Sequence, residues 1–411
     1  MPKSVWWLTI TLALFITGNA IVLSVAVVIG EKLATNPTYA TIPLVSQYVG
    51  LILATIPIAF LMQKYSRRVG FIIGNIGGLI GAGFSILGVI ESHLVYFSIG
   101  LFFTGIAIGT AQQFRFAAIE EAPISLRAKA IGLIMSGGIA AALIGPTLAI
   151  TTQRFFTEYP FAGPFITLAA IYVIAFILLL VVPLKKIVKT PSDEVLVKRN
   201  YSALYSQPIL KLIAIVSAAG YAIVVFTFAS IPLSMKQHDF AFSSIAIVFQ
   251  FHVLGMFAPS FFTGTLIHLL GAKRIIFCGI VLLILSATMN LLGNHFYNYL
   301  LAGIFVGVAW NLLLISTTNL LPHTYKMHER AKVQGMTDFL IYFFGGIGSL
   351  GAGVLFFTLG WQAMNILSVI ISATILMSFW KLKKYIPKHQ WKVISLCDGF
   401  IFRERNNFIY C

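Results

Sequence analysis

The chain has 411 residues, of which 59% are apolar and only 10% are charged, and its mean hydropathy is +0.93. A soluble domain carries roughly 25% charged residues because its surface faces water, so this composition excludes a soluble enzyme. The 28 Lys and Arg outnumber the 12 Asp and Glu, but they lie in short clusters between apolar runs. This pattern is typical of the cytoplasmic loops of a membrane protein and does not indicate nucleic-acid binding.

Twelve apolar runs follow one another, each near the roughly 20 residues that a bilayer-spanning helix needs. They predict an all-α integral membrane protein with twelve transmembrane helices in two six-helix bundles. The first six predicted spans cover residues 5–29, 39–62, 69–90, 94–118, 130–152 and 163–183. The second six cover residues 209–233, 242–267, 274–293, 297–320, 335–358 and 362–380.

The polar segments between these runs predict the domains and the orientation. We expect an N-terminal bundle at 1–183, a cytoplasmic connector at 184–208, a C-terminal bundle at 209–380 and a basic tail at 381–411. With the N-terminus inside, all but four of the 28 Lys and Arg fall on the cytoplasmic side. Both termini are therefore predicted to be cytoplasmic, in a monomer of the inner membrane. The tail mixes basic and aromatic residues, which suits an interfacial segment on anionic lipid.

Two sequence repeats relate the halves. RAKAIG at 127–132 recurs as RAKVQG at 330–335, an offset of 203 residues. AFLMQKYSRR at 59–68 is matched by GTLIHLLGAKR at 264–274, an offset of about 205 residues. Two matches at nearly the same offset indicate that the two bundles arose by internal duplication.

With these repeats the chain resembles the major facilitator superfamily, whose members have two six-helix bundles around a central substrate path. The family's loop signature after the second span keeps its basic end here at Arg67 and Arg68, and its second copy keeps Lys273. Gln63 and His268 stand where the family usually has Asp. The segment 112–132 is similar to a branch of bacterial facilitators that includes riboflavin uptake carriers.

The resemblance also implies a cytoplasmic gate. In the family, the loop Arg pairs with an acidic residue at the end of the fourth span, and Glu120 and Glu121 occupy that end here. We therefore expect at least one of these carboxylates to pair with Arg67 or Arg68 when the inner side is closed.

Polar side chains inside spans are candidates for the substrate site, because an unpaired polar group in hydrocarbon is costly and faces the bundle interior. Amides and aromatic rings dominate this set, which suits a neutral or delocalised aromatic solute. Each such residue has an alternative role in helix packing. The candidates are Asn19, Gln47, Tyr48, Gln112, Gln113, Tyr221, His252, Trp310, Asn311 and Tyr342.

Arg115 is the one basic residue that the orientation leaves inside a span, near the end of the fourth. A helix advances 100° per residue, so Glu120 and Glu121 lie on other faces of the same helix. Asp338, near the start of the eleventh span, is the best remaining partner. We expect an Arg115–Asp338 bond to close the inner gate and protonation of Asp338 to release it, which would couple protons to solute. The alternative is that Arg115 extends to the cytoplasmic interface.

These features predict a secondary active transporter that moves a small organic solute by alternating access, with proton-coupled uptake of a vitamin- or metabolite-like compound preferred. The alternative is a proton-coupled exporter of a siderophore, drug or metabolite. No Walker sequence, catalytic constellation, cofactor motif or metal-ligand cluster appears in the sequence. Cys278, Cys397 and Cys411 lack disulfide or CxxC spacing and are expected to be free thiols.

Overall fold

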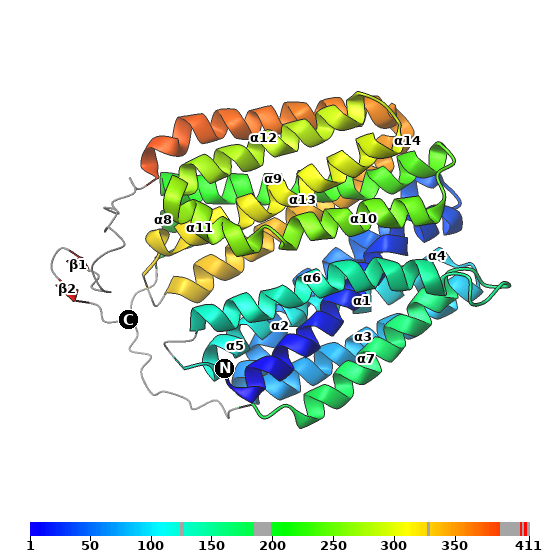
Figure 1. Cartoon of the computed structure of the whole chain (residues 1–411), viewed down its shortest axis with the longest axis horizontal. Helices are drawn as coiled ribbons and strands as arrows, with labels where there is room; N and C mark the ends of the chain where they lie inside the picture. The colour runs from blue at the N-terminus through cyan, green and yellow to red at the C-terminus, as the bar shows by residue number, and fades with distance from the viewer. Residues whose placement is uncertain (124–126, 185–198, 327–328, 387–402, 405–406, 409–411) are drawn as a thin grey trace.

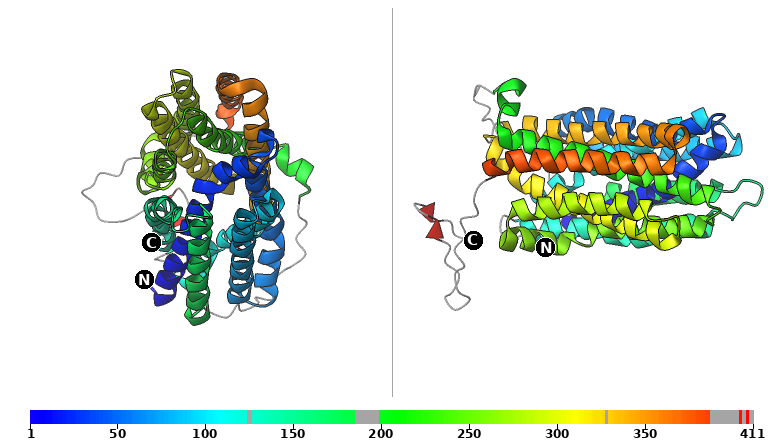
Figure 2. Two further views of the ribbon diagram at one scale, coloured as in Figure 1. Left: turned by 90° about the vertical axis from the view of Figure 1, so that its right-hand side faces the viewer. Right: turned by 90° about the horizontal axis from the view of Figure 1, so that it is seen from above.

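The computed structural model describes residues 1–123, 127–184, 199–326, 329–386, 403–404 and 407–408. The described chain is almost wholly helical, and its helices run side by side in two bundles, the first lower and the second upper in Figure 1. The end-on view separates the same two groups (Figure 2, left). We call the end that holds Lys3 and Leu382 the terminal end, and the opposite end, which holds Gly360, the far end.

The first bundle begins with its longest helix. Its successive long helices run alternately toward the far end and toward the terminal end. Ser66 caps the third helix, because its hydroxyl accepts the Val69 N–H at 3.2 Å. The elements are α1 (Lys3–Leu33), η1 (Pro37–Tyr39), α2 (Ile42–Lys64), α3 (Arg67–Ile90), α4 (Leu94–Ala111), α5 (Phe114–Glu121), α6 (Arg127–Thr152) and α7 (Ala162–Val181).

The second bundle repeats this course after a short helix at the terminal end. Its elements are α8 (Tyr201–Tyr205), α9 (Pro208–Gln237), α10 (Phe242–Phe257), α11 (Ser260–Leu270), α12 (Ala272–Leu291), α13 (Phe296–Leu320), η3 (Leu321–Thr324), α14 (Arg330–Leu382) and η5 (Lys383–Tyr385). In the tail, β1 (Arg403–Glu404) and β2 (Asn407–Phe408) pair antiparallel, with Arg403 opposite Phe408.

Four predicted spans differ from the helices observed. The predicted fourth span is not continuous, because a turn at 112–113 separates α4 from α5. The predicted eighth span bends by 43° between α10 and α11, where Pro259 has no N–H to continue the helical ladder. The predicted last two spans form the single element α14, in which Gly360 has φ 82°. Only glycine adopts that conformation without strain, so Gly360 makes the reversal at the far end.

By length and composition, eight helices of the described chain can cross a membrane, or nine when the bent pair α10 and α11 counts as one span. α14 is counted once in this number, although it holds two helices joined at Gly360. Twelve would also require α2 and α6, each of which includes side chains outside the described set. The fold class is as predicted, whereas the number twelve and the domain boundaries stay predictions.

Each bundle contains a close backbone contact between two of its own helices, and the repeat places the two contacts at matching positions. A Cβ at Gly105 of α4 would lie 2.0 Å from the carbonyl oxygen of Gln47 in α2. A Cβ at Gly307 of α13 would lie 2.3 Å from the carbonyl oxygen of His252 in α10. Because no side chain fits at either distance, these glycines allow the paired helices to touch backbone to backbone.

Candidate substrate site and gates

Four aromatic candidates meet near the middle of the molecule, and we call them the aromatic cluster. The ring centroid of Tyr221 in α9 lies 6.3 Å from that of Trp310 in α13 and 6.1 Å from that of Tyr342 in α14. It also lies 6.3 Å from the centroid of Tyr48 in α2. The hydroxyl oxygens of Tyr48 and Tyr221 are 3.2 Å apart. This hydrogen bond joins the two bundles at the level of the cluster.

The side chains of the cluster are not fully covered by other groups. All four of its side chains are half-buried, and the rings around Tyr221 are inclined to it by 50° to 85°. Aromatic pairs favour edge-to-face and offset arrangements. The cluster therefore presents both ring edges and ring faces to a planar solute.

Glycines of α14 allow it to approach α2 and α9 closely. A Cβ at Gly345 would lie 2.7 Å from Cε1 of Tyr221 and 3.3 Å from Cε1 of Tyr48. Nearer the far end, a Cβ at Gly353 would lie 2.5 Å from Oγ1 of Thr41. A side chain at Gly345 would displace Tyr221, so this glycine sets the geometry of the bond between the two tyrosines.

An amide network of the first bundle borders the aromatic cluster. Gln47 precedes Tyr48 in α2, and its Nε2 donates to Oδ1 of Asn19 at 3.0 Å and to Oγ1 of Thr104 at 3.3 Å. Gln47 is buried and Asn19 is half-buried. The sequence reasoning missed Thr104, because hydroxyls are common in spans and most bond their own helix backbone.

His252 lies apart from the aromatic cluster and serves packing within its own bundle. Its Nδ1 is 3.0 Å from the carbonyl oxygen of Gly303, and its ring stacks on Phe228 with centroids 4.9 Å apart. The pocket beside it is largely apolar and has room for about one water molecule. An organic solute does not fit there, so His252 is a packing residue in this structure.

Asn311 also has a packing role. Its Nδ2 donates to the carbonyl oxygen of Met256 and to Oγ of Ser260, both at 2.6 Å. Its Oδ1 accepts from Oγ1 of Thr263 at 2.7 Å. These three partners flank the break between α10 and α11. The regular backbone hydrogen bonds of the helix are interrupted there, so some polar groups lack a helical partner. Asn311 therefore forms hydrogen bonds with polar groups at this break, and it does not reach the aromatic cluster.

The remaining amide candidates lie toward the terminal end. Gln112 and Gln113 form the turn between α4 and α5, and both are half-buried. Nη1 of Arg67 donates to Oε1 of Gln113 at 3.3 Å, while Nη2 of Arg68 donates to the carbonyl oxygen of Val182. The structure thus connects the loop after α2 to the broken fourth span.

The structure describes the side chains of some predicted gating residues and not those of others. Glu121 is buried at the end of α5, and Asp338 is half-buried in α14. His268 and Lys273 are exposed on either side of the turn between α11 and α12. The side chains of three other candidates, Gln63, Arg115 and Glu120, lie outside the described set. The gate pairs Arg67 or Arg68 with Glu120 or Glu121, and Arg115 with Asp338, therefore stay predictions.

At the far end, contacts between the bundles include an ion pair that the sequence reasoning missed. Nζ of Lys236 in α9 lies 2.8 Å from Oε2 of Glu31 in α1, and the two side chains are 37% and 23% exposed. Nearby, Phe161 ahead of α7 meets Phe242 of α10 with ring centroids 5.2 Å apart. Glu31 and Lys236 are 205 residues apart, which is the offset of the sequence repeat. The two residues therefore occupy equivalent positions of the two bundles.

This arrangement has the parts of a carrier. A polar and aromatic site lies between two membrane-embedded bundles, and contacts at the far end join those bundles. Among the described residues, no group of His, Cys, Asp and Glu side chains is placed to hold a metal ion. The fold and the site define a multi-pass membrane transporter.

Comparison with known proteins identifies the family. The sequence profile of the Major Facilitator Superfamily matches residues 7–268 and 229–395. The chain belongs to the Major Facilitator Superfamily, as its loop signatures predict. The family consists of transporters, so this protein is a transporter of small solutes and not an enzyme.

Relatives in bacteria support this assignment. The chain is 32% identical to riboflavin transporter RfnT of Brucella anthropi over 372 residues, which cover 90% of this chain and 93% of the relative. It is 27% identical to the MFS-type transporter YdeG of Bacillus subtilis over 370 residues, or 86% of each chain. The likeness to the riboflavin branch, seen in the segment 112–132, thus extends along nearly the whole chain.

Solved structures agree on the fold. The nucleoside transporter NupG superposes with a TM-score of 0.67 over 93% of this chain and 100% of its own, at 15% identity. The POT family transporter PepTSo gives a TM-score of 0.72 over 94% of this chain and 98% of its own, at 11% identity. At such low identity these likenesses establish the fold alone.

Proposed function

We propose that this protein takes up a small planar aromatic solute of the flavin class by proton-coupled alternating access. The observation that carries this proposal is the aromatic cluster, in which Tyr48 of one bundle bonds Tyr221 of the other. A ring that enters beside Trp310 and Tyr342 would touch both bundles at once. Its binding would therefore respond to their relative movement, as a carrier requires.

Two further observations favour a flavin over other aromatic solutes. Riboflavin has a flat ring system whose polar edge carries carbonyl and N–H groups, and the amides of Gln47 and Asn19 next to the cluster offer both donors and acceptors. The relative that is 32% identical is a riboflavin transporter. We propose the same substrate class for this chain.

The proposal includes an orientation and a coupling device. We place both termini in the cytoplasm of a cell with this protein in its inner membrane, the bundles at 1–183 and 209–380, and a monomer as the working unit. Asp338 is proposed to carry the proton and Arg115 to pair with it when the inner gate is closed. Ionised Asp338 favours the paired state and neutral Asp338 the separated one, so protons and solute move together.

The direct test is uptake of labelled riboflavin by the purified protein in vesicles, with and without an imposed proton gradient. Uptake that depends on the gradient is expected. Tyr221→Ala and Trp310→Ala should each weaken the apparent riboflavin affinity at least about five-fold, since stacking on one aromatic ring is worth roughly 1–3 kcal/mol. The matched control is His252→Phe, which keeps a ring against Phe228 and should transport normally.

Two outcomes would contradict the proposal. Outward movement of solute driven by the gradient would support the alternative, a proton-coupled exporter of a siderophore, drug or metabolite. Wild-type accumulation by Asp338→Asn would show that Asp338 is not the proton carrier. Arg115→Gln and Asp338→Asn should each abolish accumulation, while exchange at equal concentrations should survive better in Asp338→Asn.

A further inference from the structure

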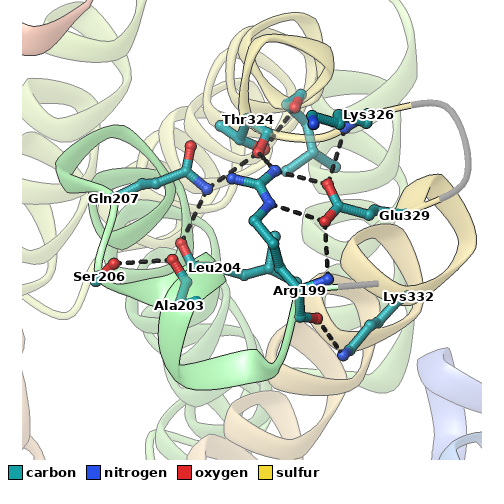
Figure 3. A network of polar contacts seen from close by, with 10 residues as sticks. Arg199, Ala203, Leu204, Ser206, Gln207, Thr324, Lys326, Glu329 and Lys332 are labelled. Atoms are coloured by element: carbon teal, nitrogen blue, oxygen red, sulfur yellow. Dashed lines mark hydrogen bonds and ion pairs between the residues drawn. The ribbon is translucent and has the colours of Figure 1, made fainter. Parts of the chain in front are cut away.

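The terminal end of the second bundle holds a polar network that the transport site does not use (Figure 3). At its centre the carboxylate of Glu329, which precedes α14, is fully buried. Oε1 accepts from the backbone N–H of Arg199 at 3.1 Å and from its Nε at 2.8 Å. Oε2 accepts from Nη2 of Arg199 at 2.6 Å and from the N–H of Lys326 at 3.0 Å. Four donors therefore satisfy this one carboxylate.

A second layer of bonds surrounds this pair. Nη2 of Arg199 also donates to the carbonyl oxygen of Thr324 at 3.2 Å, which in addition accepts from Nε2 of Gln207 at 3.1 Å. Nζ of Lys332 donates to the carbonyl oxygen of Arg199 at 2.6 Å and lies 4.3 Å from the ring centroid of Tyr201. The network thus ties together the entry to α8, the start of α9, the turn after α13 and the first turn of α14.

The charge state of this network is fixed over the physiological pH range. The guanidinium of Arg199, followed by the Lys326 N–H, holds the pKa of Glu329 far below its ordinary value. The same hydrogen bonds raise the pKa of Arg199. Glu329 therefore stays ionised at any pH at which the transporter works, which distinguishes it from a proton carrier such as the one proposed at Asp338.

The two helices that the network joins at their starts stay in contact up to the transport site. A Cβ at Gly348 of α14 would lie 2.4 Å from the carbonyl oxygen of Ala222 in α9. One turn earlier, Gly345 meets the ring of Tyr221. Gly345 is 16 residues beyond Glu329, or about 24 Å along a helix at 1.5 Å per residue. A helix of this length transmits an axial shift at its start to its middle.

We propose that Glu329 is a positioning residue for transport. By holding Arg199, it fixes the axial position and rotation of α14 against α9, so that Gly345 and Tyr342 stay aligned with Tyr221. It also makes the exit of the connector move with the second bundle as one body. This inference concerns the register of two helices and does not depend on which solute is carried or on its coupling ion.

The test measures the position of α14 against α9 by double electron–electron resonance in the full chain in nanodiscs. Spin labels are placed at the exposed positions Ile215 of α9 and Phe343 of α14, with the native cysteines replaced by Ser. The parent protein should give a single narrow distance distribution. Glu329→Gln and Arg199→Gln should each add a population displaced by about 1–2 Å, the size of known helix shifts. The double variant should match the single ones, because both remove the same pair.

Controls separate positioning from mere stabilisation. Glu158→Gln makes the same chemical change on an exposed far-end carboxylate and should leave the distribution unchanged. Arg199→Lys keeps the charge but not the double contact with Glu329, so it should add a smaller displaced population than Arg199→Gln does. This variant carries the test if Glu329→Gln does not fold. A distribution that stays narrow in Glu329→Gln or in Arg199→Lys, even with a lower melting temperature, would overturn the proposal. It would leave Glu329 with a stabilising role alone.

Discussion

The two bundles keep the same backbone contact but carry different chemistry on it. Gly105 touches the carbonyl of Gln47 in the first bundle, and Gly307 touches the carbonyl of His252 in the second. The Gln47 side chain bonds the amide of Asn19 beside the substrate candidates, whereas the His252 side chain bonds Gly303 inside its own bundle. Duplication therefore preserved the contacts that hold helices together, and the polar side chains diverged.

A second difference lies at the terminal end. The buried Glu329 of the second bundle clamps Arg199, and the repeat offset places Leu126 at the matching position of the first bundle. The aromatic cluster likewise takes three of its four rings from the second bundle and only Tyr48 from the first. We infer that the second bundle supplies most of the ring contacts, while the first supplies the amides. The following predictions test this division.

The largest effect is expected where the bundles are alike. Gly105→Ala and Gly307→Ala each place a Cβ within 2.3 Å of a carbonyl oxygen, which forces the backbone apart. Each should lower the free energy of unfolding by roughly 3 kcal/mol, the upper range for overpacking, measured by thermal unfolding in detergent. Gly83→Ala and Gly264→Ala, which meet nothing within 4 Å, are the controls. A large loss in only one bundle would show that the two contacts are not equivalent.

A somewhat smaller loss is expected for Asn311→Leu, which removes the amide at the break between α10 and α11. The carbonyl of Met256 and the hydroxyl of Thr263 would lose a buried partner, at about 2 kcal/mol. Calorimetry should show this loss, with solute affinity unchanged. Asn19→Leu changes a substrate candidate of the first bundle and should do the reverse. It should weaken solute affinity and leave the free energy of unfolding nearly unchanged. If Asn311→Leu weakens solute binding without destabilising the fold, our assignment of Asn311 to packing is wrong.

Gln47 and His252 occupy matching positions of the repeat. Substituting each of them therefore distinguishes a solute-binding role from a packing role. Gln47→Leu removes two hydrogen bonds, each worth about 0.6 kcal/mol in a membrane protein. Because the same amide is proposed to bind the polar edge of the solute, the loss of one solute hydrogen bond worth roughly 1 kcal/mol should lower the apparent affinity for labelled riboflavin about five-fold. His252→Phe should keep the wild-type affinity. Equal losses in the two variants would contradict the proposed division of labour between the bundles.

The Glu329 clamp of the second bundle should show a characteristic pH dependence. The folded-state pKa of Glu329 lies below its ordinary value of 4.5, so its stabilising effect is complete above that value and is lost as the pH falls through the folded pKa. The difference in melting temperature between wild type and Glu329→Gln should stay constant from pH 8 to about pH 5.5 and shrink below about pH 4.5. A difference that vanishes between pH 7 and pH 5.5 would mean that Glu329 titrates as a proton carrier.

The smallest effect is expected at the far end, where Glu31 and Lys236 join matching positions of the repeat. A partly exposed pair is worth roughly 0.2–1 kcal/mol, so Glu31→Gln should raise the far-end-open population by about five-fold at most. Spin labels at the exposed positions Ser92 and His295 would report it. High salt should produce the same shift in the wild type, because it screens the pair. No response to salt or to the mutation would exclude this pair as a latch.

The sequence alone determined the class of protein, the approximate spans and the pool of candidate side chains. Hydrocarbon accepts only apolar helices with satisfied backbones, so composition and run length carry that information. The same reasoning selected Tyr48, Tyr221, Trp310 and Tyr342, because polar groups in a span face the bundle interior.

Only the tertiary structure decided which candidates meet. Periodicity assigns a residue to a helix face but does not set the rotation of that helix against its neighbours, so it did not separate Tyr221 from His252 or Asn311. The break at Pro259 depends on a group from another helix, because Asn311 of α13 donates to the carbonyl oxygen of Met256 that the interrupted helix leaves without its usual partner. The clamp between Arg199 and Glu329 joins residues 130 positions apart. Such a contact arises from how the bundle closes and leaves no local pattern.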